Sequence, residues 1–518
     1  MAESITPFRI WSKPGIARDG TTLANQNHED GQWVRWQRGD PRKIGGYRRL
    51  TNLLDNPGRG MNVFDQNDQT YTHIGNINTL QQMQINPNGV VSAMSDRTPA
   101  AFTTSANNLW QFDTSYDTGA TLNYLLAHAA PNAADISSNT TAPVYYGNAT
   151  ATAVLTATAF PNVSGGVAVS GAYTWAYGSD GVVYWSAPND PDGYGAAGSG
   201  TARPCSAKIV RALALRAGAG AGPTTLFWSL NSLERATFVG GTPIFNFDTI
   251  SPMSSILSAA SVIEFNGVYF WCGIDSFLMF NGVVRDLPND MNVNYFFDNL
   301  NYAYRSRVFA MKVPRFGEIW WCYPRGAATE CTHAIIYNVK ENTWYDTSLP
   351  NSGRSCAQYA QVFRSPLMCG VDDDASATSG GYRLWQHEFG VDALDGVSVL
   401  AIDSYYETHE FGIPLGDTGA SKTSLICNVV EPDFLQTGNM YMIVKGRQNA
   451  RSEERESSAY TFAEPSTTVE GDYQQQNINI REGSRYMRFR FGSNVQGGTY
   501  QGGKIMAHFQ PGDARITS

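Results

Sequence analysis

The sequence predicts an all-β fold: a β-propeller-like body with an inserted small β subdomain and a C-terminal antiparallel β-sandwich. Aromatic residues make up 12% of the 518 residues, whereas charged residues make up 16%, below the ~25% of an average soluble domain. This composition argues against disorder, and the aromatics suit half-buried pleated surfaces. Strand-like runs also recur at roughly 40 to 55 residues, which is the spacing of four-stranded propeller blades.

Residues 1–60 are expected to form an N-terminal arm and first strands that other parts of the chain complete. Turn signals such as Pro14-Gly15 and Gly45-Gly46 interrupt this region, and Trp33–Trp36 is a short strand alternating apolar and basic residues. Its ten Lys and Arg against six Asp and Glu give a local charge of 10 − 6 = +4, although the whole chain carries −9.

Residues 61–395 are expected to form the propeller-like body. Two aromatic strands, Tyr173–Tyr177 and Val182–Trp185, flank a Ser-Asp-Gly turn and predict a hairpin. Further along, Val268–Cys272 and Glu318–Tyr323 begin two units of the same plan, each ending in a Leu-Pro pair. Several hairpins of a β-sandwich would also show strand-like runs alternating with turn signals. The recurrence of a whole unit favours a propeller.

Two further regions differ from the body. Residues 119–172 are rich in Ala, Thr, Asn and Gly, which suggests an insertion or small β subdomain within the ring of blades. Residues 396–518 are expected to form the C-terminal β-sandwich-like domain. Within it, Tyr486 and Met487 interrupt the period-two alternation that Arg488–Phe491 resumes, and the arginines are expected on an exposed face.

Charge and cysteine usage limit the classes of function. An acidic chain does not suit a sequence-independent grip on DNA, which requires clustered Lys and Arg. The seven cysteines are odd in number, lie in apolar neighbourhoods and form no CxxC pair, so we expect reduced structural thiols. The N-terminal sequence lacks the pattern of a signal peptide, and no apolar stretch approaches the ~20 residues of a membrane-spanning helix.

Two glycine-rich strings match nucleotide-binding patterns without their context. Gly193–Gly198 reads GxGxxG, but no strand precedes it and no helix follows. Gly498–Lys504 reads GxxxxGK, yet Ile505 replaces the Ser or Thr that would hold magnesium, and Lys504 opens an expected strand rather than a helix. Neither string predicts a cofactor site, and no cofactor is expected.

Candidate metal and catalytic groups are also sparse. The seven histidines are dispersed, so His387-Glu388 and His409-Glu410 are interpreted as surface or strand pairs rather than zinc ligands. The run Asp372–Asp374 offers hard oxygens to Ca²⁺, but a solvated turn is the simpler interpretation. A carboxylate pair for glycoside hydrolysis cannot be recognised from spacing in a propeller, and no GxSxG nucleophile elbow is present.

An arginine-rich strand near the C-terminus is compatible with single-stranded nucleic acid, because Arg485, Arg488 and Arg490 alternate with aromatics. Acidic residues outnumber basic ones in the same domain, so a subunit interface or an intramolecular salt-bridge ladder is the better interpretation.

Both ends of the chain resemble a known family. Pro14–Leu23, Asp30–Trp36 and Gly39–Tyr47 together resemble the start of tail nozzle (tail hub) proteins of short-tailed, podovirus-like bacteriophages. The stretch Phe491–Lys504, with Gly512–Arg515, resembles the end of the same proteins. Trp36 stands where that family has Phe, and Gly503 is an additional glycine.

The resemblance implies a non-enzymatic structural protein of the virion tail, synthesised and assembled in the host cytoplasm. It implies a homohexamer below the portal and adaptor rings that retains the genome, opens for its ejection and docks a needle, fibres or spikes. Double-stranded DNA would pass through without sequence-specific binding, which an acidic conduit favours. Candidate assembly contacts are the basic and aromatic residues of the two end segments: Arg35, Arg38, Arg42, Lys43, Tyr47, Arg488, Arg490 and Tyr500.

Two other classes of function remain open. A propeller of this size also suits a receptor-binding or glycan-degrading tailspike, which predicts a cleft with convergent carboxylates. A soluble propeller adaptor in the cytoplasm, with no virion, is the third reading. Polysaccharide cleavage distinguishes the enzyme, and six-fold rings in negatively stained particles distinguish the virion component.

Overall fold

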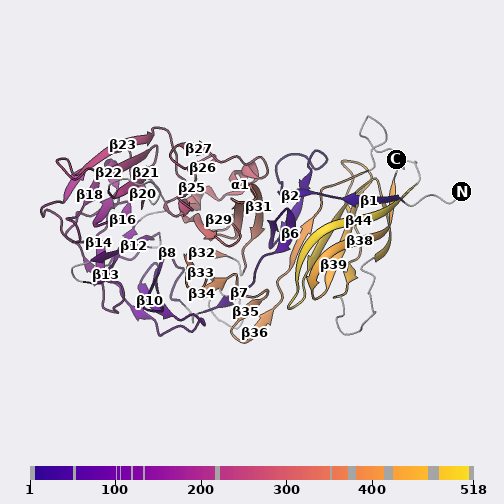
Figure 1. Ribbon diagram of the computed structural model, residues 1–518, viewed down its shortest axis with the longest axis horizontal. Coiled ribbons are helices and arrows are strands. Elements are labelled where there is room, and N and C mark those ends of the chain that lie inside the picture. The colour runs from indigo at the N-terminus through magenta and orange to yellow at the C-terminus, as the bar shows by residue number, and fades with distance from the viewer. Residues whose placement is uncertain are drawn as a thin grey trace.

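The computed structural model describes residues 6–50, 54–100, 102–105, 107–117, 121–131, 135–215, 222–350, 353–371, 381–412, 424–464 and 478–512. Figure 1 shows two bodies along the long axis, a ring of small sheets and a β-sandwich, with N-terminal strands between them. Strands dominate the described residues, in which α1 (Val293–Asn299) is the one α-helix. The predicted all-β, propeller-like class is therefore confirmed.

Seven blades of four antiparallel strands form the ring in the described residues. Blades one to three contain β8 (Gly60–Gln66), β9 (Gln69–Gly75), β10 (Leu80–Ile85), β11 (Ser95–Asp96); β12 (Leu109–Asp117), β13 (Leu122–Ala130), β14 (Val144–Asn148), β15 (Thr156–Ala157); and β16 (Gly166–Ser170), β17 (Tyr173–Tyr177), β18 (Val183–Trp185), β19 (Gly200–Ala202). Blades four to six contain β20 (Ile209–Ala214), β21 (Thr224–Ser229), β22 (Leu233–Phe238), β23 (Phe245–Ser251); β24 (Ile263–Phe265), β25 (Val268–Cys272), β26 (Phe277–Phe280), β27 (Val284–Asp286); and β28 (Phe309–Val313), β29 (Glu318–Tyr323), β30 (His333–Asn338), β31 (Thr343–Ser348).

The seventh blade combines the two halves of the chain. It contains β32 (Arg354–Ala360), β33 (Ser365–Val371) and β34 (Tyr382–His387), and its fourth strand is the N-terminal β7 (Tyr47–Arg49). A short hairpin, β35 (Ala393–Asp395) with β36 (Ser398–Leu400), continues the sheet beyond β7. Because β32 also contacts β8, the first strands of the blades close into a ring.

The predicted hairpin is confirmed, and one expectation is corrected. The hairpin around the Ser-Asp-Gly turn forms from β17 and β18. In the first blade, Val91 makes one isolated bridge to Ile85, and β11 takes the outer position. Residues 119–172 form no separate insertion in their described part, because β13, β14, β15 and β16 belong to blades two and three.

The sandwich also combines both ends of the chain. Its first sheet contains β42 (Ile478–Ser484), β38 (Leu425–Thr437), β44 (Thr499–Pro511), β6 (Asp40–Lys43), β5 (Val34–Gln37) and, beside β44, β1 (Thr6–Ile10). Its second sheet contains β4 (Asp30–Gln32), β37 (Ser404–Glu407), β43 (Tyr486–Ser493), β39 (Met440–Arg447), β40 (Arg455–Glu456) and β41 (Tyr460–Phe462). The remaining pair, β2 (Lys13–Ile16) and β3 (Asn27–His28), is parallel, and β2 lies against β31 of the propeller.

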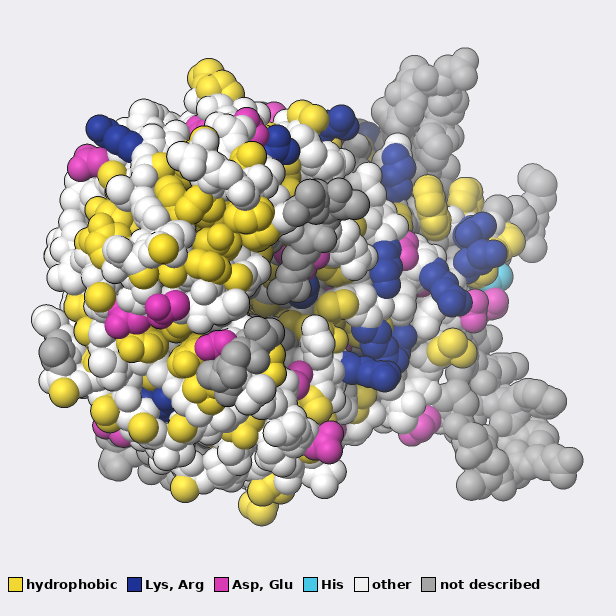
Figure 2. Space-filling view, turned by 60° about the vertical axis from the view of Figure 1, so that its left-hand side comes forward, with side chains coloured by type: hydrophobic (Ala, Val, Ile, Leu, Met, Phe, Trp, Pro, Cys, Tyr) yellow, Lys and Arg dark blue, Asp and Glu magenta, His cyan; other side chains and the backbone are white. Residues whose placement is uncertain are grey.

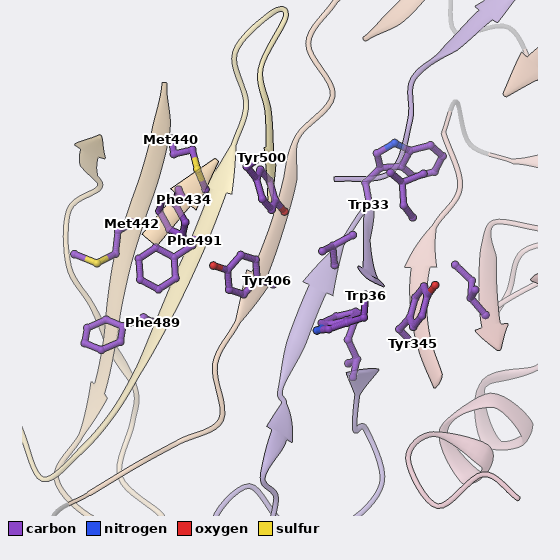
Figure 3. Packing of buried hydrophobic residues seen from close by; sticks show 14 of the residues in the cluster. Trp33, Trp36, Tyr345, Tyr406, Phe434, Met440, Met442, Phe489, Phe491 and Tyr500 are labelled. Atoms are coloured by element: carbon purple, nitrogen blue, oxygen red, sulfur yellow. The ribbon is translucent and has the colours of Figure 1, made fainter. Parts of the chain in front are cut away.

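One hydrophobic core runs from the sandwich into the propeller. In Figure 3, aromatic and Met side chains of the sandwich strands lie on one side of the core, and Trp33, Trp36 and Tyr345 lie on the other side. The Trp36 ring lies 5.2 Å from that of Tyr345 on β31, and the Trp33 ring lies 6.0 Å from that of Trp320 on β29. The N-terminal segment thus joins the two bodies by packing rather than acting as a loose arm.

Alternation in β43 begins earlier than expected. Met487, Phe489 and Phe491 are buried in the sandwich core, whereas Tyr486, Arg488 and Arg490 lie on the opposite face. Tyr486 and Met487 therefore follow the period of two instead of interrupting it. The side chains of successive strand residues point to opposite faces, so this register also fixes where the two arginines lie.

Candidate functional site

Residues that directly precede the first strands of the blades meet at the centre of the propeller. Two small adjoining cavities, of about 30 and about 10 Å³, open there and share Leu109 and Ser306 in their walls. We call this region the central mouth. Its charged residues come from several blades: Arg59, Asp135, Lys208 and Arg307. Asn108 is one of the polar residues beside them.

Glu330 is held between two arginines at this mouth. Arg59 donates to both carboxylate oxygens, at 2.8 and 2.7 Å, and Arg307 donates to Glu330 Oε1 at 2.9 Å. Arg307 also donates to the Thr329 carbonyl at 2.7 Å. These bonds connect Arg59, which precedes β8 of blade one, with two parts of blade six: Arg307, which precedes β28, and Glu330, which lies between β29 and β30.

The other charged pair at the mouth is looser. Lys208 Nζ donates to the Ser138 carbonyl, and burial lowers the pKa of Lys208 to about 8. Hydrogen bonds from Ser137 lower the pKa of Asp135, and Arg305 and Lys208 add a smaller effect. Asp135 is thereby kept ionised, whereas a general acid for glycoside hydrolysis needs a raised pKa.

Four of the candidate assembly residues are already engaged inside the chain. Arg35, Lys43, Tyr47 and Tyr500 are buried. Lys43 Nζ donates to the Gly498 carbonyl at 2.7 Å, and Tyr500 hydroxyl lies 2.9 Å from that of Ser404. Tyr47 stacks on His387 of β34. A buried side chain cannot contact another subunit, so for these four residues the structure replaces an expected assembly role with an intramolecular one.

Arg35 is the centre of a buried ion network. Its guanidinium lies 2.8 Å from Glu318 on β29 and 2.5 Å from Glu388, and it stacks over the Phe316 ring at 3.8 Å. Glu318 also accepts hydrogen bonds from Trp320 at 2.9 Å and Tyr345 at 2.6 Å. The sequence signal for this role was the basic residue inside the aromatic strand Trp33–Trp36.

Arg488 and Arg490, for which the sequence left a subunit interface and an intramolecular ladder open, form a ladder within the chain. Both contact the buried carboxylate of Glu407 on β37, at 3.2 and 2.5 Å, and Lys445 on β39 contacts it at 2.6 Å. Arg488 also lies 2.5 Å from Glu454. One buried carboxylate thus contacts three cations across neighbouring strands, and Glu454, Glu456 and Asp30 supply the further negative charge.

Arg38 and Arg42 keep partly or fully exposed side chains. Arg38 is in a turn with φ of 57°, and its backbone N–H donates to Glu341 at 2.9 Å. Arg42 donates to Gln37 at 3.0 Å within the same hairpin. Their assembly role stays a prediction.

The other motifs take ordinary structural places. Gly193–Gly198 lies in the connection between β18 and β19, and Lys504 lies inside β44. His387 accepts a hydrogen bond from Arg354, and His409 pairs with Ser12. The seven cysteines are free and buried.

Two findings concern metal ions and membranes. No group of three or more His, Cys, Asp or Glu in the described residues is placed to hold a metal ion. Asp372–Asp374 lies outside those residues. No helix in the described part of the chain has the length and apolar character to cross a membrane.

Sequence reasoning missed the central mouth. Arg59, Lys208 and Glu330 are isolated charges in the sequence, and no motif connects them. The available signal was positional: each of the two cations directly precedes the first strand of a blade, which is where the centre of a propeller is built.

No family model and no curated protein matches the chain. Solved structures with similar strand arrangements include an exo-β-1,3-galactanase from Phanerochaete chrysosporium, with 10% identity and a TM-score of 0.31 over 90% of this chain and 99% of that one. An ancestral GH74 enzyme has 11% identity and a TM-score of 0.40, over 71% and 52% of the two chains. Regucalcin, a calcium-binding protein from Agrobacterium tumefaciens, has 9% identity and a TM-score of 0.32, over 68% and 97%. Likenesses of this size carry no inference about activity.

Proposed function

We propose that the chain is a structural component of a bacteriophage tail, of the tail nozzle class. In this proposal, six copies form a ring below the portal and adaptor, retain and release the genome, and dock a needle or fibres. One observation carries it: the two strings that resemble nozzle proteins, at opposite ends of the sequence, fold together into one unit.

Contacts between the two strings are specific. Gln501 on β44 pairs with Arg42 on β6, and the Lys43 ammonium donates to the Gly498 carbonyl. Gly502 lies so close to Pro41 and Tyr406 that an added Cβ would approach their side chains within 2.9 and 2.8 Å. Distances under 3.0 Å are essentially never seen for real Cβ atoms, so a larger residue at this crossing would force Pro41 or Tyr406 to shift. The residues that carry the resemblance therefore contact one another within the sandwich.

The surface of the propeller also suits packing against other copies. Residues 61–205 contain two basic residues, and one of them, Arg97, is buried, so Arg203 is the exposed cation of that whole stretch. Figure 2 shows broad apolar areas over the propeller, with the dark blue Lys and Arg gathered toward the sandwich. Large apolar patches with few charges are typical of protein interaction sites.

Mass photometry of the purified full-length protein, combined with a polysaccharide-cleavage assay, tests the proposal. A species of six times the 56.7 kDa chain mass, with no cleavage, is the expected result. A monomer at all concentrations that depolymerises a host polysaccharide would contradict it and support the tailspike alternative.

A further inference from the structure

The outer strand of blade four is long and lies at the edge of its sheet. Blades one, two, three and five end in β11, β15, β19 and β27, which have two or three residues each. β23 has seven residues, and in the described part of the chain it pairs with β22 alone. β31 of blade six has six residues, but the N-terminal strands β2 and β4 lie against it. Among the described blades, blade four therefore presents the longest free edge.

The backbone groups on this edge have no partner among the described residues. Val239 N–H donates to the Ile244 carbonyl at 2.8 Å, so the Ile244 carbonyl points toward β22. Backbone groups of successive strand residues point alternately to the two sides, so those of Phe245, Phe247 and Thr249 point outward. No described residue outside the β22 pairing bonds them. An edge of unpaired N–H and C=O groups is a template for another strand.

Apolar side chains lie at both ends of the same edge. Val239, which follows β22, is 59% exposed, and Met253, which follows β23, is 90% exposed. Between them, Phe247 and Ile250 are partly exposed. These side chains belong to the broad apolar areas of the propeller (Figure 2). Apolar surface beside an unpaired strand edge is typical of a site that binds a strand of another protein chain.

The sequence of β23 is complementary to itself in one antiparallel register. When Phe247 faces Phe247 of a second copy, Asn246 faces Asp248 and Phe245 faces Thr249, each pair occurring twice. The Asn246 amide donates to Asp248 Oδ1 within the chain, at 3.1 Å, and its second N–H can donate to the Asp248 carboxylate of the other copy. Facing aromatic pairs and facing polar pairs of this kind stabilise a sheet.

Hydrogen bonding and charge select this register. With the two-fold axis at Phe247, all the outward backbone groups of residues 245, 247 and 249 fall in hydrogen-bonded positions, where each facing pair exchanges two bonds. An axis at Asp248 would place two carboxylates opposite each other, which is unfavourable. An axis at Asn246 would place the Asp248 carboxylate opposite the apolar Ile244.

We propose that two copies of this chain pair through the outer edges of their β23 strands, antiparallel, about a two-fold axis at Phe247. The two blades then form one continuous sheet, and Val239 and Met253 flank the contact at both of its ends. A second copy is the occupant because the edge is complementary to itself, as a two-fold interface requires. A two-fold contact does not close a six-fold ring, so this pairing goes beyond the tail role and stands independently of it.

Disulfide trapping in the full-length protein tests the register. The variants Asn246→Cys and Asp248→Cys are mixed and oxidised with glutathione disulfide, and the native cysteines do not interfere because all seven are buried. Facing residues at such positions have Cα atoms about 4.5 Å apart, which a disulfide spans. A cross-linked dimer is expected from the mixture and from neither variant alone. No cross-link in the mixture, or a cross-link of Asn246→Cys to itself, would overturn the proposal.

Charge variants at an exposed position test the contact without a cross-link. Asn246→Asp places a carboxylate opposite Asp248 twice in the dimer and is expected to raise the dissociation constant about tenfold or more. Asn246→Lys places a cation there and is expected to keep or lower that constant. Asn281→Asp, at the exposed turn between β26 and β27, is the matched control. Sedimentation velocity across a dilution series measures the dimer, and equal constants for the Asp and Lys variants would overturn the proposal.

Hydrogen exchange on the unmodified protein avoids dependence on variants. Amides of the β23 peptide are expected to exchange more slowly at high than at low protein concentration, whereas those of β27 are expected to exchange equally at both. Exchange of β23 that does not depend on concentration over the range in which dimers form would contradict the proposed contact.

The pairing and the tail role fail separately. Particles of twice the 56.7 kDa chain mass that cross-link as expected, without six-fold rings, would refute the tail role and support the pairing. Six-fold rings built from chains whose 246 and 248 variants do not cross-link would refute the pairing and support the tail role.

Discussion

Arg35 connects the N-terminal segment to the propeller through charge as well as packing. It is 1% exposed, and its counter-charges lie on different elements, Glu318 on β29 and Glu388 after β34. A buried pair of this kind adds little stability compared with an apolar replacement of the whole network, but losing one partner leaves a buried charge uncompensated.

Arg35→Met is therefore expected to lower the free energy of unfolding by about 3–5 kcal/mol. The variant would leave Glu318 and Glu388 facing each other without a cation. Denaturant titration followed by tryptophan fluorescence measures the change. Arg38→Met is the control, since the exposed Arg38 side chain is expected to contribute within about 0.5 kcal/mol. Similar losses in the two variants would contradict the structural role of Arg35.

Buried histidines predict how stability depends on pH. Burial, with the nearby Arg97 charge, lowers the pKa of His73 to about 3, while His73 in the unfolded chain titrates near 6.5. Between these values only the unfolded chain binds the proton. Stability from the neutral ring is thus complete above about pH 6.5 and is lost as the pH falls toward 3.

His73→Gln is expected to flatten the dependence of unfolding free energy on pH between 4 and 6 by up to about 1.4 kcal/mol per pH unit. Denaturant titrations at several pH values provide the measurement. His508→Gln serves as the control because His508 is partly exposed on the sandwich. An unaltered slope in His73→Gln would show that this ring is protonated in the folded protein.

At the residue scale, the sequence predicted a role where a residue's own strand determines it, and failed where distant parts of the chain determine it. For Arg488 and Arg490 the excess of acidic residues in their domain predicted either a subunit interface or a salt-bridge ladder, and the structure shows the ladder. Burial of Lys43 and Tyr500 could not be predicted, since each is covered by the opposite end of the chain. The central mouth could not be predicted either, because its cations become neighbours only when the seven blades close into a ring.

At the scale of elements, β7 closes the ring. Its three residues pair with Trp385, Gln386 and His387 on β34, so the last blade is completed by a strand from the start of the chain. Opening this pairing would detach the N-terminal segment from the propeller.

Hydrogen exchange tests this closure. Backbone amides of β7 are expected to exchange as slowly as those of β33, because opening the seam requires breaking the buried packing of Tyr47 as well as its hydrogen bonds. Exchange mass spectrometry on the full-length protein compares the two peptides, and β1 at the sandwich edge is the reference for a peripheral strand. Fast exchange throughout β7 would contradict a closed ring.

Strands were predictable where their residues are aromatic and local turns define them. Val268–Cys272 and Glu318–Tyr323 match β25 and β29 at both ends. Residues 119–172 misled because Ala, Thr and Gly carry little hydrophobic pattern, yet inner strands such as β16 need small side chains where blades meet. Gly165 illustrates this: an added Cβ there would lie 2.4 Å from the Ile209 carbonyl of the next blade.

For the whole molecule, pairing between distant segments determines the architecture. The repeat length predicted blades, but local sequence does not encode that β7 joins blade seven or that β1, β4, β5 and β6 complete the sandwich. Such contacts span most of the chain, and only their combined burial stabilises them.

Assembly is expected to use the charge-poor surface of the propeller. Val239 and Met253, at the ends of the outer strands of blade four, are 59% and 90% exposed. The double variant Val239→Lys/Met253→Lys places two charges in this apolar surface and is expected to weaken multimer formation at least tenfold, measured by mass photometry across a dilution series. Val397→Lys, at the exposed β35–β36 turn, is the control. Equal assembly in the two variants would place the contact elsewhere.

Electron microscopy of the purified full-length protein, with averaging of single particles in negative stain, tests the proposed tail role most directly. The account predicts rings with six-fold symmetry, each subunit showing a propeller beside a sandwich and the ring enclosing a central passage. Isolated two-lobed particles, without rings at any protein concentration, would contradict it.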